Sequence, residues 1–211
     1  MAGHIADSKS ISWCSPLWVT DAAKAVFGGG GIDLDPCANA GSIRRTGAYY
    51  NYTLPDNDGL VDSWEAVDGV AIQSIYVNPP FGSYYMNLLT KHIVMGKEYR
   101  QMVEEGHDMK AYKKLGIEDW RKRCAEVAAK GIEIIHLGPA NVETIPFQDY
   151  IEGTAQAIAY PRGRLYYEEV DSDGAILQTG PAPMASAIVY WGENPQTFKD
   201  AYLPFGSVHI L

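Results

Sequence analysis

The segment Asn78-Pro79-Pro80-Phe81 combines residue types suited to chemistry on an amine. The Asn side-chain oxygen and the carbonyl of the next residue are two acceptors for the two hydrogens of an exocyclic amine. They would favour a pyramidal, nucleophilic nitrogen. The prolines fix the backbone, and the Phe81 ring is suited to stack on a purine. A plain strand end followed by a turn, with Phe81 in the core, fits the same residues and stays open.

Three apolar segments are expected to be the strands that position these groups. Residues 31–35 form a strand that stops at Pro36, residues 72–77 form one that runs into Asn78, and residues 131–137 form a third. Ligands of such sheets bind beyond the carboxyl ends of the strands. We therefore expect Asp35 and Asn78 to share one crevice.

The remaining pattern alternates helix and strand and then becomes strand beside strand. Helices are predicted at 17–27, 84–105 and 117–130, with a loop or insertion at 106–116. Further strands are predicted at 155–160, 164–168 and 184–191, with a turn at 171–174 that is typical of a hairpin. This order predicts an α/β fold whose sheet is mostly parallel, with an antiparallel strand near one edge.

Several short motifs occur in an order that resembles the phage-type DNA N6-adenine methyltransferase family (Dam-like), over about residues 13 to 191. They are Trp13-Cys14-Ser15-Pro16, Leu34-Asp35-Pro36-Cys37-Ala38, Asp58-Gly59-Leu60 with Trp64, Asn78-Pro79-Pro80-Phe81, Leu137-Gly138-Pro139-Ala140 and Arg162-Gly163-Arg164-Leu165. The resemblance implies a single Rossmann-like methyltransferase domain spanning 1–211, with seven strands and helices on both faces. It also implies methyl transfer from S-adenosylmethionine to N6 of adenine in DNA, with Asn78, Pro79, Pro80 and Phe81 as catalytic residues.

The resemblance also implies a cofactor site, in which an acid faces the cationic ammonium and sulfonium. Its residues would be Ser15, Pro16, Asp33, Asp35, Pro36, Cys37, Ala38, Asp58, Leu60 and Asn78. The sequence departs from the family pattern in three places: Phe81 replaces a Tyr, Ser15 replaces a Thr, and the loop after Asp35 has less glycine. Strand-end solvation of Asp33 and Asp35, an Asp58-Gly59 turn and a helix start at Ser15 are the structural alternatives.

The charge of the chain is unevenly distributed. The net charge is −9, yet residues 91–130 hold 10 of the 17 basic and 7 of the 26 acidic residues. We expect this stretch to be a helical, basic insertion that contacts DNA phosphates. The candidate contacts are Lys110, Lys113, Lys114, Arg121, Lys122 and Arg123. A solvated helix face, in which these cations pair with Glu118, Asp119 and Glu126, is the alternative.

Other features limit the function classes. The three cysteines and five histidines are scattered, so we expect no metal site. The polar first ten residues are not typical of a signal peptide, and no apolar run reaches the length of a membrane span. We expect a cytoplasmic protein, encoded by a phage or prophage in a bacterial host.

Two alternatives to the expected function stay open. A methyltransferase of cytosine N4, RNA guanine N2 or protein glutamine is one, and a non-catalytic binding module is the other.

Overall fold

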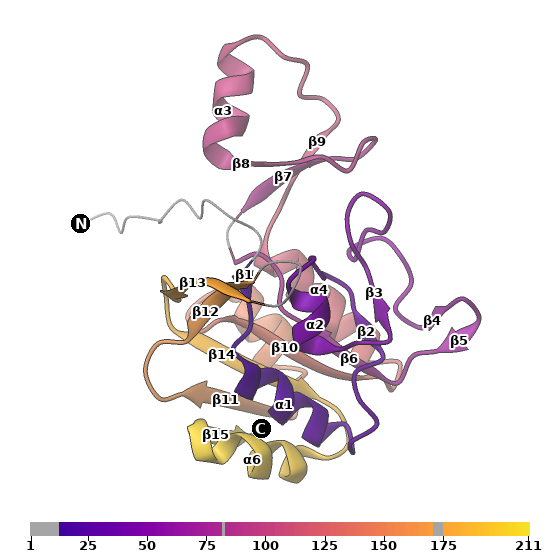
Figure 1. Ribbon diagram of the computed structural model, residues 1–211, viewed down its shortest axis with the longest axis vertical. Helices are drawn as coiled ribbons and strands as arrows, with labels where there is room; N and C mark the ends of the chain where they lie inside the picture. Colours follow the sequence, from indigo (N-terminus) through magenta and orange to yellow (C-terminus); the bar gives the residue numbers. More distant parts are fainter. Residues whose placement is uncertain (1–12, 82, 171–174) are drawn as a thin grey trace.

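The computed structural model describes residues 13–81, 83–170 and 175–211 (Figure 1). Within these residues the molecule is built around a mixed sheet of seven strands. In order across the sheet, the strands are β15 (Gly206–Ile210), β11 (Ala157–Pro161), β14 (Ser186–Trp191), β10 (Glu133–Pro139), β6 (Ser74–Val77), β2 (Leu34–Asp35) and β3 (Tyr50–Asn51). The α/β class and the seven strands confirm the expectation from the sequence.

The directions of the strands correct one part of that expectation. From β3 to β10, neighbouring strands are parallel. The pairs β10–β14, β14–β11 and β11–β15 are all antiparallel. The prediction of a mostly parallel sheet with one antiparallel strand is therefore wrong over half of the sheet. The reason is that β14 and β15 both run against the other strands, and β15 was not foreseen.

Helices cover both faces of the sheet, as expected. On one face lie α1 (Leu17–Val26), α6 (Pro195–Tyr202) and the short 3-10 turn η2 (Leu203–Phe205). On the other lie α4 (Ile117–Ala128), α5 (Ile145–Phe147) and the π-helical turn η1 (Gln148–Glu152). A hydrophobic core lies on each face of the sheet. Because side chains alternate along a strand, β10 contributes to both cores: Ile135 packs with α1 and Ile134 with α4.

The first helix forms where the sequence predicts it. Pro16 precedes its first turn, and Val19, Ala22, Ala23 and Val26 form its buried face. This spacing places all four side chains on the same side of the helix. Gly28 then adopts a φ of +71°, a conformation that ends the helix at low cost.

Smaller antiparallel sheets flank the central one. One contains β1 (Trp13–Cys14), β12 (Tyr166–Val170) and β13 (Ile176–Pro181), and a hairpin joins β4 (Ala66–Val67) to β5 (Val70–Ala71). The strand predicted at 164–168 is thus separate from β11 and belongs to another sheet. The turn predicted at 171–174 and the polar residues 1–10 lie outside the described residues.

Residues 84–115, here called the arm, project from the body of the molecule (Figure 1). The arm comprises β7 (Tyr84–Asn87), β8 (Ile93–Met95), α3 (Gly96–Glu104) and β9 (Tyr112–Leu115). The helix predicted at 84–105 is therefore wrong in its first half, and the loop predicted at 106–116 contains β9. Tyr84 and Met86 are buried while Tyr85 is only half-buried, which is the two-residue period of a strand.

The helix predicted at 117–130 is confirmed as α4, but it belongs to the body. Trp120, Cys124 and Val127 pack in the core on that face of the sheet. The basic stretch at 91–130 is consequently not one helical insertion. Its first part lies in the arm and its last part covers the sheet.

A close approach at Gly59 provides a test of the fold beside β2. A Cβ atom on Gly59 would lie 1.8 Å from the backbone oxygen of Pro36 and 2.9 Å from the Trp120 ring. Gly59→Ala should therefore displace backbone and lower the free energy of unfolding by about 1–3 kcal/mol or more. Gly30→Ala, which meets only ordinary contacts, is the matched control and should stay within about 0.5 kcal/mol of wild type. Urea unfolding measures both, and equal stabilities would contradict the close packing.

Candidate functional site

A pocket opens where β2 and β6 end side by side. The two strands are parallel neighbours, with Leu34 opposite Ile75, so both carboxyl ends reach the same edge of the sheet. The empty volume of the pocket is about 240 Å³, counted with its open mouth. Its lining is almost entirely polar: Ser15, Thr20, Asp35, Cys37, Asn39, Ser42, Arg45, Thr46, Tyr76 and Asn78. The expected crevice shared by Asp35 and Asn78 is therefore present.

Asp35 is the buried acid of this pocket. Its side chain is 3% exposed. One carboxylate oxygen accepts from the backbone N–H of Cys37 at 3.1 Å, and the other from the Ser42 hydroxyl at 3.4 Å. Burial raises the pKa of Asp35 to about 6, although these hydrogen bonds oppose the shift. The carboxyl group is thus mostly ionised at neutral pH and presents a poorly solvated negative charge.

Asn78 occupies the adjoining wall of the pocket. It is half-buried and therefore has open space beside it, whereas Pro79 directly behind it is buried. Burial also raises the pKa of the Cys37 thiol, while a hydrogen bond from the Asn78 backbone opposes that rise. This contact joins the loop after β2 to the loop after β6. The two loops therefore form one continuous surface.

Phe81 lies further along the same loop. Its ring meets the Tyr167 ring edge-on, with ring centroids 5.5 Å apart. Phe81 is partly buried against the core beneath α1, and Pro80 is half-buried. This packing agrees with the structural alternative given above, in which Phe81 is a core residue after a turn. Stacking on a purine remains a prediction.

The Ser15-Pro16 segment divides between pocket and helix. Ser15 lines the pocket, and its hydroxyl lies 2.6 Å from the Tyr76 hydroxyl. Pro16 is buried at the start of α1, where its carbonyl accepts from the Val19 N–H at 3.0 Å. Pro16 therefore acts as a helix start, while Ser15 faces the site.

Asp33 requires a correction, because it lies outside the pocket lining. Its carboxylate accepts from the backbone N–H groups of Gln73 at 2.8 Å and Ser74 at 3.0 Å. These groups belong to the amino end of β6, the end opposite Asn78. Asp33 is thus an acceptor at the amino end of β6, whereas Asp35 lies at the carboxyl end of β2.

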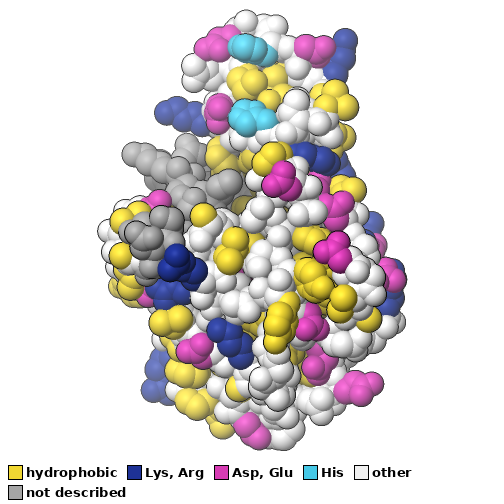
Figure 2. Space-filling view, turned by 45° about the vertical axis from the view of Figure 1, so that its right-hand side comes forward, with side chains coloured by type: hydrophobic (Ala, Val, Ile, Leu, Met, Phe, Trp, Pro, Cys, Tyr) yellow, Lys and Arg dark blue, Asp and Glu magenta, His cyan; other side chains and the backbone are white. Residues whose placement is uncertain are grey.

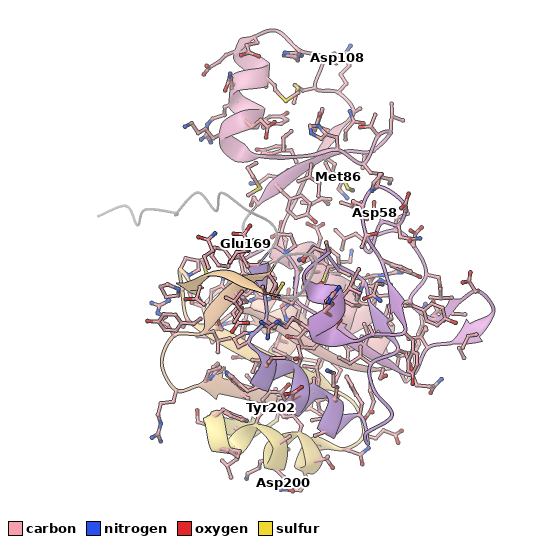
Figure 3. All side chains as sticks on the ribbon, in the orientation of Figure 1. Asp58, Met86, Asp108, Glu169, Asp200 and Tyr202 are labelled. Atoms are coloured by element: carbon pink, nitrogen blue, oxygen red, sulfur yellow. The ribbon has the colours of Figure 1, made fainter. Side chains whose placement is uncertain are left out.

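The other expected cofactor residues lie outside the lining of the pocket. Pro36 is buried against Gly59, and Ala38 is half-buried in the loop after β2. Asp58 lies where the body meets the arm (Figure 3), and its carboxylate binds the Lys91 ammonium at 3.0 Å. Leu60 packs against the small core of the arm. Only Ser15, Asp35, Cys37 and Asn78 of the expected set line the pocket itself.

Several pocket residues were missed from the sequence, and most come from the segment after β2. The Asn39 side-chain oxygen accepts from the N–H groups of Gly41 and Ser42, which starts the short helix α2 (Ser42–Thr46). That helix brings Ser42, Arg45 and Thr46 to the pocket. The spacing Asn-x-x-Ser was the available signal, since Asn and Ser cap helices. The adjacent Arg44 and Arg45 gave no such signal.

The six candidate phosphate contacts separate into two groups. Lys110, Lys113 and Lys114 are exposed on the arm, and Lys122 is exposed on α4 beside Glu126, 3.8 Å away. On the face of the arm seen in Figure 2, basic side chains are mixed with acidic and histidine side chains. This face is therefore not uniformly positive.

Arg121 is a correction to that list, whereas Arg123 stays a candidate. Arg121 is 1% exposed, and its guanidinium donates to the Pro139 carbonyl and to the Asn141 side chain. Arg123 is half-buried, lies over the Trp64 ring and donates to the Asp62 carbonyl at 3.0 Å. Both cations hold elements of the body together. The buried Arg121 is therefore not available to bind phosphate, and for the half-buried Arg123 a phosphate contact stays a prediction.

Other kinds of site receive no support from the described residues. Across 13–81, 83–170 and 175–211, no group of three or more His, Cys, Asp or Glu side chains is arranged to hold a metal ion. None of the helices in those ranges has the length and apolar character needed to cross a membrane. No family model matches the chain, and no curated protein matches it.

The buried carboxyl of Asp35 predicts a specific pH dependence of stability. Its folded pKa of about 6 exceeds the ordinary 3.8, so protonation favours the folded state. Wild type should therefore lose about 3 kcal/mol of folding free energy as the pH rises from about 4 to 7. Asp35→Asn should lack this loss. The difference between the two urea-unfolding curves, measured across that range, isolates the group.

Asp56→Asn, which changes an exposed carboxylate, is the matched control and should follow wild type. If the curves of wild type and Asp35→Asn stay parallel from pH 4 to 7, Asp35 is not the desolvated acid described above.

Proposed function

We propose that this chain transfers a methyl group from S-adenosylmethionine to the N6 amine of adenine in DNA. The observation that carries the proposal is the shared pocket, in which Asn78 and the buried Asp35 meet at the ends of neighbouring strands. The ordered motifs that resemble the phage-type family support it further. The coarse architecture, a mixed seven-stranded sheet with helices on both faces, is compatible with a Rossmann-like methyltransferase domain.

The proposed chemistry assigns separate tasks to the residues of the catalytic loop. The Asn78 side-chain oxygen and the Pro79 carbonyl accept hydrogen bonds from the two N–H groups of the amine, which leaves the nitrogen lone pair directed at the methyl group. The C–N bond would form as the C–S bond breaks, with S-adenosylhomocysteine as the leaving group and one amine proton released to solvent. Pro79 and Pro80 fix the backbone so that these acceptors are preorganised. Phe81 contributes an apolar surface for the base. Since the target amine lies inside the duplex stack, the base must be extruded or presented in a single strand.

The pocket fits the amino-acid end of the proposed cofactor. When bound, S-adenosylmethionine supplies an electrophilic methyl group on a cationic sulfonium. The Asp35 carboxylate and a ring of hydroxyl groups suit a cationic, hydrogen-bonding ligand. The empty volume of about 240 Å³ includes the open mouth of the pocket, so the match to the amino-acid end rests on charge and hydrogen bonding and not on size.

DNA is the proposed substrate because a locally basic arm projects next to the catalytic loop. The arm contains six basic and four acidic residues, while the whole chain has a net charge of −9. The arm is held to the body by the Trp120–Tyr84 hydrogen bond of 3.1 Å and by the Lys91–Asp58 ion pair. These two contacts tie the arm to the body, and phosphate contacts at its lysines would orient DNA over the pocket.

Asn78→Ala tests the chemical assignment. Removing one acceptor from the attacking amine should lower the rate of methyl transfer by about 100-fold or more and leave cofactor affinity nearly unchanged. The assay supplies S-adenosylmethionine with DNA, RNA or protein and identifies the methylated product by mass spectrometry. Asn57→Ala, an Asn outside the pocket lining, is the control and should retain full activity. Full activity of Asn78→Ala would refute its role, and methylation of cytosine, RNA or protein alone would identify the alternative substrates.

Charge reversal on β9 tests the DNA surface. Lys113→Glu with Lys114→Glu should weaken DNA binding and reduce the slope of log K against log salt by up to about 2. Lys199→Glu on α6, at the end of the molecule opposite the arm (Figure 1), is the control and should bind as wild type does. Fluorescence anisotropy at several salt concentrations measures both variants. Unchanged affinity and slope in the β9 variant would exclude the arm as a phosphate contact.

A further inference from the structure

Arg45 is a buried cation in the same pocket as Asp35. It is 8% exposed and reaches the pocket from α2, whereas Asp35 reaches it from β2. The Nη2 atom of Arg45 donates to the Glu168 carboxylate on β12. Glu168 is the neighbour of Glu169, which is labelled in Figure 3. A guanidinium has five N–H donors on three nitrogens, so the bond to Glu168 uses only part of its capacity.

The charges of this region act on one another over short range. Burial raises the pKa of the Cys14 thiol to about 11, and the charges of Arg45, Glu168 and Asp35 also influence it. Cys14 pairs with Glu168 across the β1–β12 ladder. The Arg45 guanidinium and the Glu168 carboxylate to which it donates therefore both lie near the Cys14 thiol. Burying an ionic group is costly unless it is paired, so a cation at this place calls for anionic partners.

The combination of charges limits the class of ligand. The pocket presents a carboxylate from Asp35, a guanidinium from Arg45 and the hydroxyl groups of Ser15, Ser42 and Thr46. A phosphate would be repelled by the Asp35 carboxylate, and a neutral nucleoside would make no use of a buried guanidinium. An α-amino acid carries an ammonium and a carboxylate on one carbon, which complements one buried anion and one buried cation.

We propose that Arg45 binds the α-carboxylate of the amino-acid end of S-adenosylmethionine, while Glu168 holds its guanidinium in place. This inference rests on the proposed function and names the residue that makes the pocket selective for a zwitterion. Arg45 binds the carboxylate through its N–H donors, and planar guanidinium geometry matches a carboxylate better than an ammonium does. The Lys24 ammonium donates to the Arg45 carbonyl at 3.2 Å and so supports the helix that carries it.

A cycle of two ligands and two proteins tests the contact. The ligands are S-adenosylmethionine and its decarboxylated analogue, which differ only in the carboxylate, and calorimetry measures each dissociation constant. Wild type should bind S-adenosylmethionine about 10- to 100-fold more tightly than the analogue, since a charged hydrogen bond is lost. Arg45→Gln should bind both ligands with nearly equal affinity. Arg45→Lys should recover part of the preference.

Matched variants separate this role from a structural one. Arg44→Gln changes an exposed neighbour on the same helix and should keep the wild-type preference. Because Arg45→Gln leaves Glu168 without its cation, the double variant with Glu168→Gln provides a folded protein with no buried charge at this pair. It too should show no preference between the ligands.

The outcomes distinguish the two proposals. If Arg45→Gln weakens both ligands by the same factor, or keeps the full preference for the carboxylate, the assignment of Arg45 is overturned while cofactor binding stands. If wild type binds neither ligand, the proposed methyltransferase function is overturned, and the role of Arg45 with it.

Discussion

The carboxylate of Asp35, buried at the end of β2, is the constraint around which the site is organised. Its charge loses solvation on folding, which is why its pKa rises to about 6. The protein keeps the group ionised at neutral pH by supplying an N–H from Cys37 and a hydroxyl from Ser42. Those two donors come from the loop and helix that follow the strand. The local path of the chain after β2 is therefore set by the need to satisfy one acid.

The same requirement explains why the neighbouring loops pack so closely. The turn at Gly59 contacts the Pro36 backbone so tightly that a methyl group has no room. The Asn78 backbone meets the Cys37 side chain from the other side. With loops fixed on both sides, the Asp35 carboxylate has little freedom to turn toward bulk water. A rigid, poorly solvated anion attracts a cationic ligand strongly. The same desolvation lowers the stability of the folded state as long as no cation is bound.

The sequence was informative about the site because strand ends have clear signals. Two prolines must end β6 at Asn78, and Pro36 ends β2 after Asp35, so their meeting at one edge followed from parallel pairing. Arg45 could not be predicted in this way, since its place depends on the five-residue helix α2 and on a partner, Glu168, more than 100 residues away in the chain. Asp33 was misplaced because strand alternation cannot show whether an acid serves the amino or the carboxyl end.

The errors in the fold have similar physical causes. Residues 84–95 contain aromatic and apolar side chains that suit either period, and they form strands because β7 pairs with both β8 and β9. The pairing with β9 joins segments separated by α3 and an irregular stretch, which no local pattern reveals. One of the three antiparallel pairs of the sheet joins β15 to the distant β11. Local periodicity therefore predicted which segments are the strands that bear the site, but it did not predict the order and direction of all strands in the sheet.

Arg121 shows how a buried basic residue can support the edge of the sheet that carries the pocket. Its burial against the Phe147 ring lowers its pKa to about 10, so it remains a cation at neutral pH. It donates to the Pro139 carbonyl, the last residue of β10, which is the parallel neighbour of β6. The carbonyl at the end of β10, beside the strand that leads into Asn78, is thereby satisfied by a side chain. Because an unpaired buried carbonyl is costly, the buried guanidinium stabilises this strand end.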